Sequence, residues 1–357
     1  MQPPPLPDQT DVLVVGAGIA GACVALALKG RRAVTVVDAG RPASGASGAA
    51  AGLVNPFMGR KAKPAWRHEE ALDALDGFLD AAGTPSGTRR DGIVRPATSE
   101  VQALTFAERA AQHPGLGWLG PEAAAERWPL VASPHGALAV HRGGAVRIPA
   151  FVEAAIRASG ADLHLGVSFQ ADEHGHVAIT DQGETRYRTL VLALGDGAHR
   201  LPMLDALPLH RVKGQTVRLG AALPDGHPAV AGNGYVVPEA GGVVVGSTFE
   251  HTFSDTEADP SLDAGLTAAA ARLVPCVAGA EVVERRAGVR LTVPVSVSPR
   301  RLPLAGPIPG HTDVYVLSGL GAKGLLMAPL LARHLADALD GRAAMPPEVD
   351  PASVLGG

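Results

Sequence analysis

The hydrophobic positions near the N-terminus form two short runs, separated by a glycine-rich turn and a helical pattern. The β-branched run DVLVV at 11–15 is typical of a strand that is buried on both faces. The turn GAGIAG at 16–21 follows it, and the helical pattern at 22–30 ends at Gly30, a common residue just past a helix. Residues 33–38, AVTVVD, predict a second strand. Together these segments predict a strand–helix–strand unit of about thirty residues.

Further along the chain, the pattern predicts both helices and strands. We expect helices at about 68–82, 100–112, 121–127, 148–160 and 259–275. Residues 163–195 and 211–250 alternate short strands with turns, and the second set favours an antiparallel sheet. Residues 313–341 predict a strand, a glycine-rich turn and a long amphipathic helix. Residues 40–67 form a long Gly/Ala/Ser loop, and such a loop inside a compact domain is usually functional.

Length and composition exclude several classes of protein. A chain of 357 residues is long enough for two domains, and 46% hydrophobic residues can bury a large core. The formal net charge of −4 argues against a protein whose main work is binding a phosphate backbone. Cys23 and Cys276 are too few for a disulfide framework or a four-cysteine zinc site, and the histidines lack metal-binding spacing. We therefore expect no bound metal.

The N-terminal sequence predicts neither a signal peptide nor a membrane span. The first ten residues contain no basic segment followed by an apolar one. The longest apolar run, 12–28, is divided by glycines into a strand and a helix. We expect a cytoplasmic protein with no further domain before residue 11.

The turn at 16–21 has the spacing of a dinucleotide-binding fingerprint. Alone, GxGxxG also fits an ordinary glycine-rich turn, but here it follows a predicted strand and opens a predicted helix. The first glycine permits the tight turn, the second lets backbone approach a pyrophosphate, and the third lets the helix lie close to the strand. An acid at the end of the second strand is placed to bind ribose hydroxyls. The candidate cofactor-binding residues here are Gly16, Gly18, Ile19, Ala20, Gly21 and Asp38.

Small residues after the second strand bear on which dinucleotide is bound. In SGASGAAAG at 44–52, Ser44 and Ser47 can hydrogen-bond phosphate and ribitol oxygens, and the small residues let backbone lie against a flat ring. This favours FAD over NAD, with Ala51 and Gly52 as further candidate contacts. A flexible linker is the alternative for the segment, and an NAD-linked dehydrogenase is the alternative for the chain.

The ordered set of motifs resembles the D-amino-acid-oxidase-type flavoproteins. This family includes glycine oxidase, monomeric sarcosine oxidase and the oxidase domain of the bifunctional tRNA 5-methylaminomethyl-2-thiouridine-modifying enzyme. Besides the two N-terminal motifs, the resemblance rests on LVLALGDGAH (190–199), RVKGQ (211–215), GYVVPEAGGVVVGSTFE (234–250), AGVR (287–290), PLAG (303–306) and LSGLGAKGLLMAPLLA (317–332). The C-terminal block, together with GSTFEHTFSD at 246–255, resembles the tRNA-modifying oxidase domain and its stand-alone relatives more than it resembles sarcosine oxidase.

The resemblance implies an α/β fold with two discontinuous domains. A Rossmann-like FAD-binding domain would use residues 1–75, 147–205 and 298–357. A second, α+β substrate domain built on an antiparallel sheet would use residues 76–146 and 206–297.

The resemblance also implies further contacts with FAD. They are Phe169, Ala193, Gly195, Gly321, Ala322, Lys323 and Gly324. The chain departs from the family at 195–197, where it has Gly-Asp-Gly in place of the frequent Gly-Ala-Trp. Some members attach FAD through a cysteine, but residues 291–299 contain none, so we expect FAD to be bound non-covalently.

Arg290, in AGVR, is the residue that the resemblance implies for the substrate carboxylate. A guanidinium matches a carboxylate with two parallel hydrogen bonds, which fixes orientation as well as charge. Arg285 and Arg286 are competitors close in sequence, and a structural arginine is the alternative. Tyr235 is a second catalytic candidate that would order the substrate, and a buried core tyrosine is its alternative.

The implied reaction is oxidation of the C–N bond of an amino acid or secondary amine, with hydride transfer to flavin N5 and reoxidation by O2 or another acceptor. Three alternatives stay open: an oxidase acting on carboxymethylaminomethyl-modified tRNA, an NAD-linked dehydrogenase, and a non-catalytic flavin-binding subunit. The composition does not favour a nucleic-acid partner. The basic cluster Arg60, Lys61, Lys63 and Arg67 is read as a solvated loop, with contact to an anionic substrate as its alternative.

Overall fold

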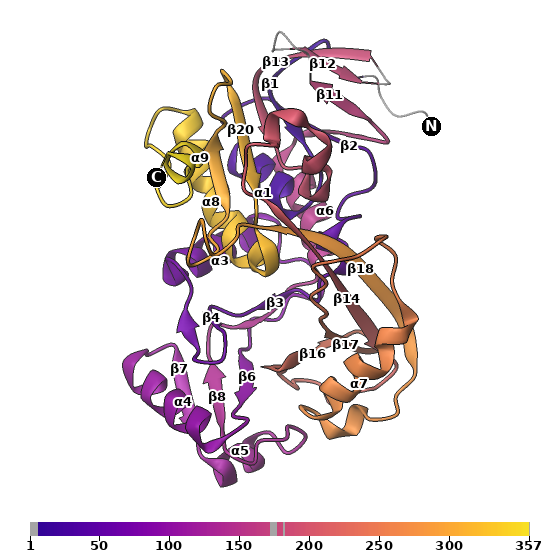
Figure 1. Ribbon diagram of the computed structural model, residues 1–357, viewed down its shortest axis with the longest axis vertical. Coiled ribbons are helices and arrows are strands. Elements are labelled where there is room, and N and C mark those ends of the chain that lie inside the picture. Colours follow the sequence, from indigo (N-terminus) through magenta and orange to yellow (C-terminus); the bar gives the residue numbers. More distant parts are fainter. Residues whose placement is uncertain (1–5, 172–176, 181–182, 357) are drawn as a thin grey trace.

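Two large β-sheets, one above the other in Figure 1, form the body of the molecule. The computed structural model describes residues 6–171, 177–180 and 183–356. Strands of the first and second sheets alternate along the chain, in the order first, second, first, second, first. On this basis we propose the two-domain division given above. Among the described residues, no helix is both long enough and apolar enough to cross a membrane.

The first sheet has a parallel centre made of valine- and leucine-rich strands. β1 pairs in parallel with β2 and β13, and β13 pairs in parallel with β20. Along β1, Val12 and Val14 face one core and Leu13 and Val15 face another, so the strand is buried on both sides. The strands are β1 (Gln9–Val15), β2 (Val34–Asp38), β10 (Asp162–Leu165), β11 (Phe169–Ala171), β12 (Val177–Thr180), β13 (Gly183–Leu192), β19 (Leu304–Pro307) and β20 (Val314–Ser318).

Four helices cover one face of the first sheet. They are α1 (Ile19–Ala27), α3 (His68–Ala81), α6 (Ile148–Ser159) and α8 (Gly324–Leu339). The first of them, IAGACVALA, is apolar on all sides and packs against both α6 and α8. A helix of this kind is stable only inside the protein, so α1 is enclosed between the sheet and its neighbours.

The second sheet has the order β18-β14-β17-β16-β15-β6-β8-β7. Its pairings are antiparallel except that between β15 and β6. Helix α7 (Asp263–Ala271) packs on one face, where Leu266 and Ala270 meet Val217 and Val236. On the other face, β14 and β18 contact residues 46–49. The strands are β6 (Ile93–Pro96), β7 (Leu116–Leu119), β8 (Ala137–Val140), β14 (His210–Leu219), β15 (Ala229–Gly232), β16 (Gly234–Glu239), β17 (Gly242–Gly246) and β18 (Val282–Thr292).

The remaining elements lie around and between the two sheets. The helices are α2 (Ala46–Ala49), α4 (Glu100–Gln112), α5 (Pro121–Arg127) and α9 (Pro351–Leu355). The two-residue strands are β3 (Leu53–Val54), β4 (Phe57–Met58), β5 (Lys63–Pro64) and β9 (Gly144–Ala145). The 3₁₀ turns are η1 (Gly195–Arg200), η2 (Pro202–Leu204), η3 (Pro260–Leu262), η4 (Pro275–Val277) and η5 (Gly321–Lys323).

The structure differs from the predicted elements in three places. Helix α1 begins at Ile19 rather than 22, because Gly21 lies inside the helix instead of before it. The helix expected at 259–275 is divided into the turn η3 and the helix α7. Residues 40–67, expected as loop, contain α2 and three very short strands.

Candidate active site

The glycine turn after β1 is built by contacts that exclude any side chain. Gly16 has φ +113°, and a Cβ placed there would lie 2.3 Å from the carbonyl oxygen of Ala193. A Cβ on Gly21 would lie 1.9 Å from the carbonyl oxygen of Gly16. The turn is therefore pressed between α1 and the end of β13. This brings the sequence-predicted residues Gly16, Gly21 and Ala193 together.

The start of α1 offers hydrogen-bond donors to an anion. Within the described part of the chain, the N–H groups of Gly18 and Ala20 have no protein acceptor, and that of Ile19 donates to Ser47 Oγ at 3.1 Å. Gly18 is not enclosed by backbone as Gly16 and Gly21 are, because an added Cβ would meet only the Ser47 side chain, with Oγ at 3.3 Å. Free N–H groups at a helix N-terminus attract phosphate. These residues fit the pyrophosphate of a dinucleotide.

Asp38 joins the end of β2 to the glycine turn. Its Oδ2 accepts from the N–H of Ala17 at 2.6 Å, and its Oδ1 accepts from the N–H of Gly40 at 2.7 Å. The N–H of Val167 donates to the Asp38 carbonyl at 3.0 Å, which places Phe169, two residues further on, close to this end of the sheet. The carboxylate thus has both a structural role and a position suited to ribose hydroxyls.

We expect Asp38→Ala to weaken FAD binding by roughly 1–3 kcal/mol, because polar partners of the carboxylate are left unpaired. Fluorescence titration of apoprotein with FAD measures the change in dissociation constant. Asp11→Ala is a matched control, because Asp11 Oδ2 accepts from the N–H of Ala33 at 3.2 Å at the opposite end of β1. Equal affinities of the Asp38 variant and the wild type would count against this binding register.

The segment 44–52 passes between the two sheets. The hydroxyl of Thr216 on β14 donates to the carbonyl of Ala49 at 2.9 Å, and a Cβ on Gly288 of β18 would lie 2.8 Å from Ala46 Cα. Gly52, at φ +74°, accepts from the N–H of Val146 at 2.8 Å. A cleft of about 530 Å³ runs beside this segment, and its lining includes Ser44, Ala51, Arg41, Arg147, Glu239 and Arg286.

The turn at 319–324 reaches the same place from the C-terminal side. A Cβ on Gly324 would lie 3.4 Å from Ile19 Cγ2, so the turn and η5 lie against the start of α1. Leu320 forms an isolated bridge with Thr292, the last residue of β18. The N-terminal cofactor-binding candidates at 16–21 and the C-terminal candidates at 321–324, which include Gly321 and Ala322, are therefore neighbours in the structure.

The Lys323 side chain is held by backbone carbonyl groups instead of being free to contact a cofactor. Its Nζ donates to the carbonyl oxygens of Arg300 and Arg301, at 2.9 and 2.5 Å. Burial, with a smaller effect of Arg301, lowers the pKa of Lys323 to about 8. The side chain therefore fastens η5 to the preceding loop, a role that the sequence did not indicate.

Gly195 begins η1 with φ +54°, directly after Ala193 and Leu194. Asp196, which follows it, accepts two hydrogen bonds of 2.7 Å from Arg211 at the start of β14. The unusual Gly-Asp-Gly sequence therefore supplies an ion pair between the first sheet's turn and the second sheet.

Arg290 lies between the two predicted cofactor segments. It shares a face of β18 with Gly288, which meets α2, and with Thr292, which meets Leu320. Its Nη2 donates to the carbonyl of Thr248 at 3.0 Å, and its Cζ lies 4.6 Å from the centroid of the Phe249 ring. Burial lowers the pKa of Arg290, although not enough to discharge a guanidinium.

Arg290 forms no ion pair with an acid among the described residues, in contrast to its neighbours. Arg285 binds Asp263 at 2.6 Å, and Arg286 binds Glu284 at 2.7 Å. The two competitors are therefore neutralised within the protein. The Arg290 guanidinium differs from both in that its contacts, with the Thr248 carbonyl and the Phe249 ring, leave its charge unneutralised.

Tyr235 is on β16, on the face of the sheet that Arg290 shares. It stands opposite Gly246, and Gly246 stands opposite Thr216 of β14. Burial raises the pKa of Tyr235, while a hydrogen bond with Ser247 and the charge of Arg290 act in the other direction. The phenol is therefore protonated near neutral pH and can donate a hydrogen bond.

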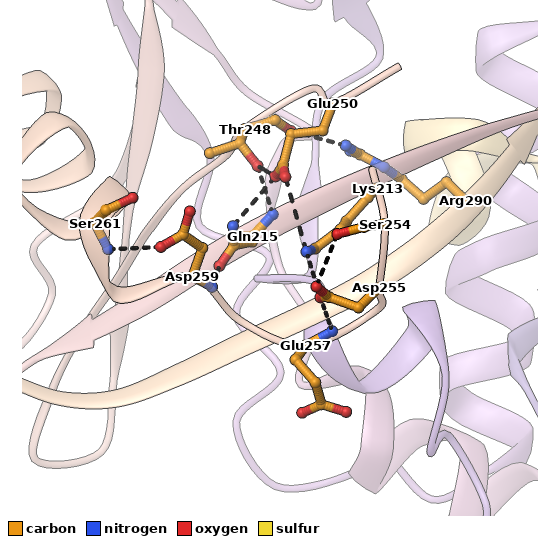
Figure 2. A network of polar contacts seen from close by, with 10 residues as sticks. All are labelled: Lys213, Gln215, Thr248, Glu250, Ser254, Asp255, Glu257, Asp259, Ser261 and Arg290. Carbon is orange, nitrogen blue, oxygen red and sulfur yellow. Dashed lines mark hydrogen bonds and ion pairs between the residues drawn. The ribbon is translucent and has the colours of Figure 1, made fainter. Parts of the chain in front are cut away.

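The sequence reasoning missed a polar network on the opposite face of β14, drawn in Figure 2. Lys213 and Gln215 alternate with Gly214 along the strand, and both side chains are buried. Lys213 Nζ lies 3.3 Å from Asp255 Oδ1 and 3.9 Å from Glu250 Oε2. The only sequence signal was the pair of segments RVKGQ and GSTFE.

Comparison with known proteins shows the family of this chain. The model of the family described as FAD dependent oxidoreductase matches residues 11–338. The chain is 32% identical to the tRNA 5-methylaminomethyl-2-thiouridine biosynthesis bifunctional protein MnmC of Thiobacillus denitrificans, over 93% of this chain and 56% of that protein. It is 30% identical to glycine oxidase of Pseudomonas aeruginosa, over 96% of this chain and 97% of that protein. The crystal structure of glycine oxidase from Geobacillus kaustophilus matches with a TM-score of 0.80 and 26% identity, over 95% of this chain and 96% of that one.

Proposed function

We propose that this chain, which belongs to the FAD dependent oxidoreductase family, oxidises the C–N bond of an amino acid or secondary amine that carries a carboxylate. The observation that carries the proposal is the unpaired Arg290 guanidinium between α2 and the turn at 319–324. An arginine in this state needs an anion, and a substrate carboxylate supplies one in bidentate geometry.

The residues present fit FAD. At Gly16 and Gly21 the backbone packs too closely against neighbouring carbonyl groups to admit a side chain. The start of α1 has N–H groups free for phosphate. Gly16, Gly18, Ile19 and Ser47 would hold the pyrophosphate, and Asp38 the ribose. We keep the non-covalent attachment as a prediction, because Cys276 is on η4, outside β18.

The chain's own residues bind and orient the substrate. Arg290 would hold the carboxylate, and the protonated Tyr235 hydroxyl would donate to the amine or the carboxylate. When bound, FAD supplies the hydride acceptor. An amine that arrives neutral needs no dedicated base, so the protein's contribution is placement and charge. The reoxidant, O2 or another acceptor, and a cytoplasmic location stay predictions.

A second candidate, oxidation of a carboxymethylaminomethyl group on tRNA, is favoured by the similarity to the bifunctional protein. The chain spans little more than half of that protein, so this activity is a proposal only. The substrate group carries the same carboxylate and secondary amine, so Arg290 would serve it equally. Arg41 and Arg147, which line the cleft beside α2, would be available to RNA phosphates.

An anaerobic flavin-bleaching screen tests the proposed function. We expect at least one of glycine, sarcosine, proline, D-amino acids or modified tRNA to bleach the bound flavin. Bleaching by modified tRNA alone would select the second candidate. If none of these amines bleaches the flavin, the chain is better explained as a non-catalytic flavin-binding subunit.

A further inference from the structure

Residues 248–250, here called the anchor segment, make two contacts with the Arg290 guanidinium. The Thr248 carbonyl accepts from Nη2, and the Phe249 ring lies over the guanidinium face. The Phe249 side chain is 63% exposed, so packing around the ring contributes little to holding it there. The position of the guanidinium therefore depends on what holds the anchor segment.

Glu250 holds the anchor segment to β14 (Figure 2). Its Oε1 accepts from the Thr248 hydroxyl at 2.6 Å and from the Gln215 amide at 3.2 Å, and its Oε2 is the oxygen that faces Lys213. Backbone bonds complete the attachment, from Thr248 N to the Gln215 carbonyl at 3.2 Å and from Glu250 N to the Lys213 carbonyl at 2.9 Å. One carboxylate thus ties both neighbours of Phe249 to the strand.

Burial makes the Glu250 network strong. The side chains of Lys213 and Gln215 are on residues only 4% and 2% exposed, and hydrogen bonds among desolvated groups gain more than those in water. The other acid beside Lys213 is Asp255, whose side chain is 60% exposed. Among the described residues, Asp255 bonds to Lys213, Ser254 and Glu257 and not to the anchor segment. The two acids therefore share a cation but differ in what else they hold.

We propose that Glu250 is a positioning residue for the substrate carboxylate, acting through Thr248 on Arg290. This inference rests on the proposed function of Arg290. The Thr248 carbonyl occupies one N–H of the guanidinium, and Phe249 covers one face. A carboxylate can form its two parallel bonds only along the remaining N–H edge. By fixing the anchor segment, Glu250 fixes the direction from which the substrate binds.

Glu250→Gln keeps the shape of the side chain but replaces one acceptor oxygen with an N–H₂ group. We expect the KM for a carboxylate amine to rise about tenfold with kcat changed less than about twofold, because the guanidinium is misplaced while the chemistry is intact. Bound flavin should be unchanged. Thr248→Val removes the hydroxyl that donates to Glu250 Oε1 and accepts from the N–H of Gln215 at 2.8 Å, and it should reproduce the rise. Asp255→Asn is the matched control and should leave KM unchanged.

Combination with Arg290→Lys separates positioning from a general structural effect. If Glu250 acts through Arg290, Glu250→Gln raises KM in the wild type but adds nothing in the Arg290→Lys background. An equal rise in both backgrounds, or unchanged KM in both Glu250→Gln and Thr248→Val, overturns the inference. If Arg290→Lys alone has no effect on KM, the proposed function of Arg290 fails as well, and the two failures are thus distinguished.

Discussion

Arg290→Ala is expected to lower kcat/KM for a carboxylate amine by roughly 30-fold or more, with FAD still bound. Removing one partner of a desolvated charge pair typically costs about 2–5 kcal/mol, and each 1.36 kcal/mol is about tenfold in rate. Neither neighbouring arginine can take over the role of Arg290, because Arg285 and Arg286 are already paired with acids. Steady-state kinetics and the flavin absorbance of the same preparation measure both parts of the expectation.

Two further variants and one change of substrate sharpen the Arg290 test. Arg290→Lys should recover only part of the activity, because an ammonium cannot form the bidentate pair. Arg285→Ala, on the same strand, should leave kcat/KM nearly unchanged. The wild type should also reject a substrate whose carboxylate is replaced by an amide. If the amide is oxidised equally well and Arg290→Ala is without effect, Arg290 is structural and the enzyme acts on simple amines.

Gly18→Val should abolish stoichiometric FAD binding while the protein stays folded. A Cβ on Gly18 would meet only the Ser47 hydroxyl, at 3.3 Å, and this side chain can shift, so the fold should tolerate the substitution. The branched side chain would occupy the space that the proposed register gives to the pyrophosphate. The ratio of flavin to protein absorbance measures cofactor content, and circular dichroism measures the fold. Retention of one FAD per chain would contradict the assignment.

Gly21→Ala provides the contrast to Gly18→Val. Its Cβ would lie 1.9 Å from the Gly16 carbonyl oxygen, so α1 must move and the folded state itself is destabilised. We expect this variant to lose secondary structure or solubility together with FAD. Substitutions at two glycines of one motif are thus predicted to have different effects: Gly18→Val prevents FAD binding, and Gly21→Ala prevents folding.

The sequence was most informative where function depends on local geometry. The turn at 16–21 could be predicted because its glycines have a fixed spacing between one strand and the helix that follows it, although the contact of Gly16 with the distant Ala193 could not. The helices at 68–82, 100–112 and 148–160 followed from their hydrophobic period and lie within one residue of the observed bounds. The FAD assignment followed from the order of motifs, and the family match over residues 11–338 confirms it.

Other features could not be predicted, because they depend on contacts between distant segments. β6, with the sequence IVRP, carries an arginine and a proline in a four-residue strand, and its alternation is too short to detect. Two partners of the Glu250 carboxylate, Lys213 and Gln215, are on β14, so they meet it only when β14 has paired with β17 and the residues that follow β17. The contact of Lys323 with two carbonyls likewise has no pattern in the chain.

The interleaving of the two sheets has a consequence for how the chain acquires its cofactor during synthesis. Gly16 lies against Ala193, and the start of α1 lies against Gly324, so the surroundings of the first glycine turn are incomplete until residue 324 has left the ribosome. Contacts between segments so far apart in sequence form late, because loop closure must precede them. We therefore expect FAD to be captured late in folding, so that a nascent chain that stalls before the turn at 319–324 gains no stability from the cofactor.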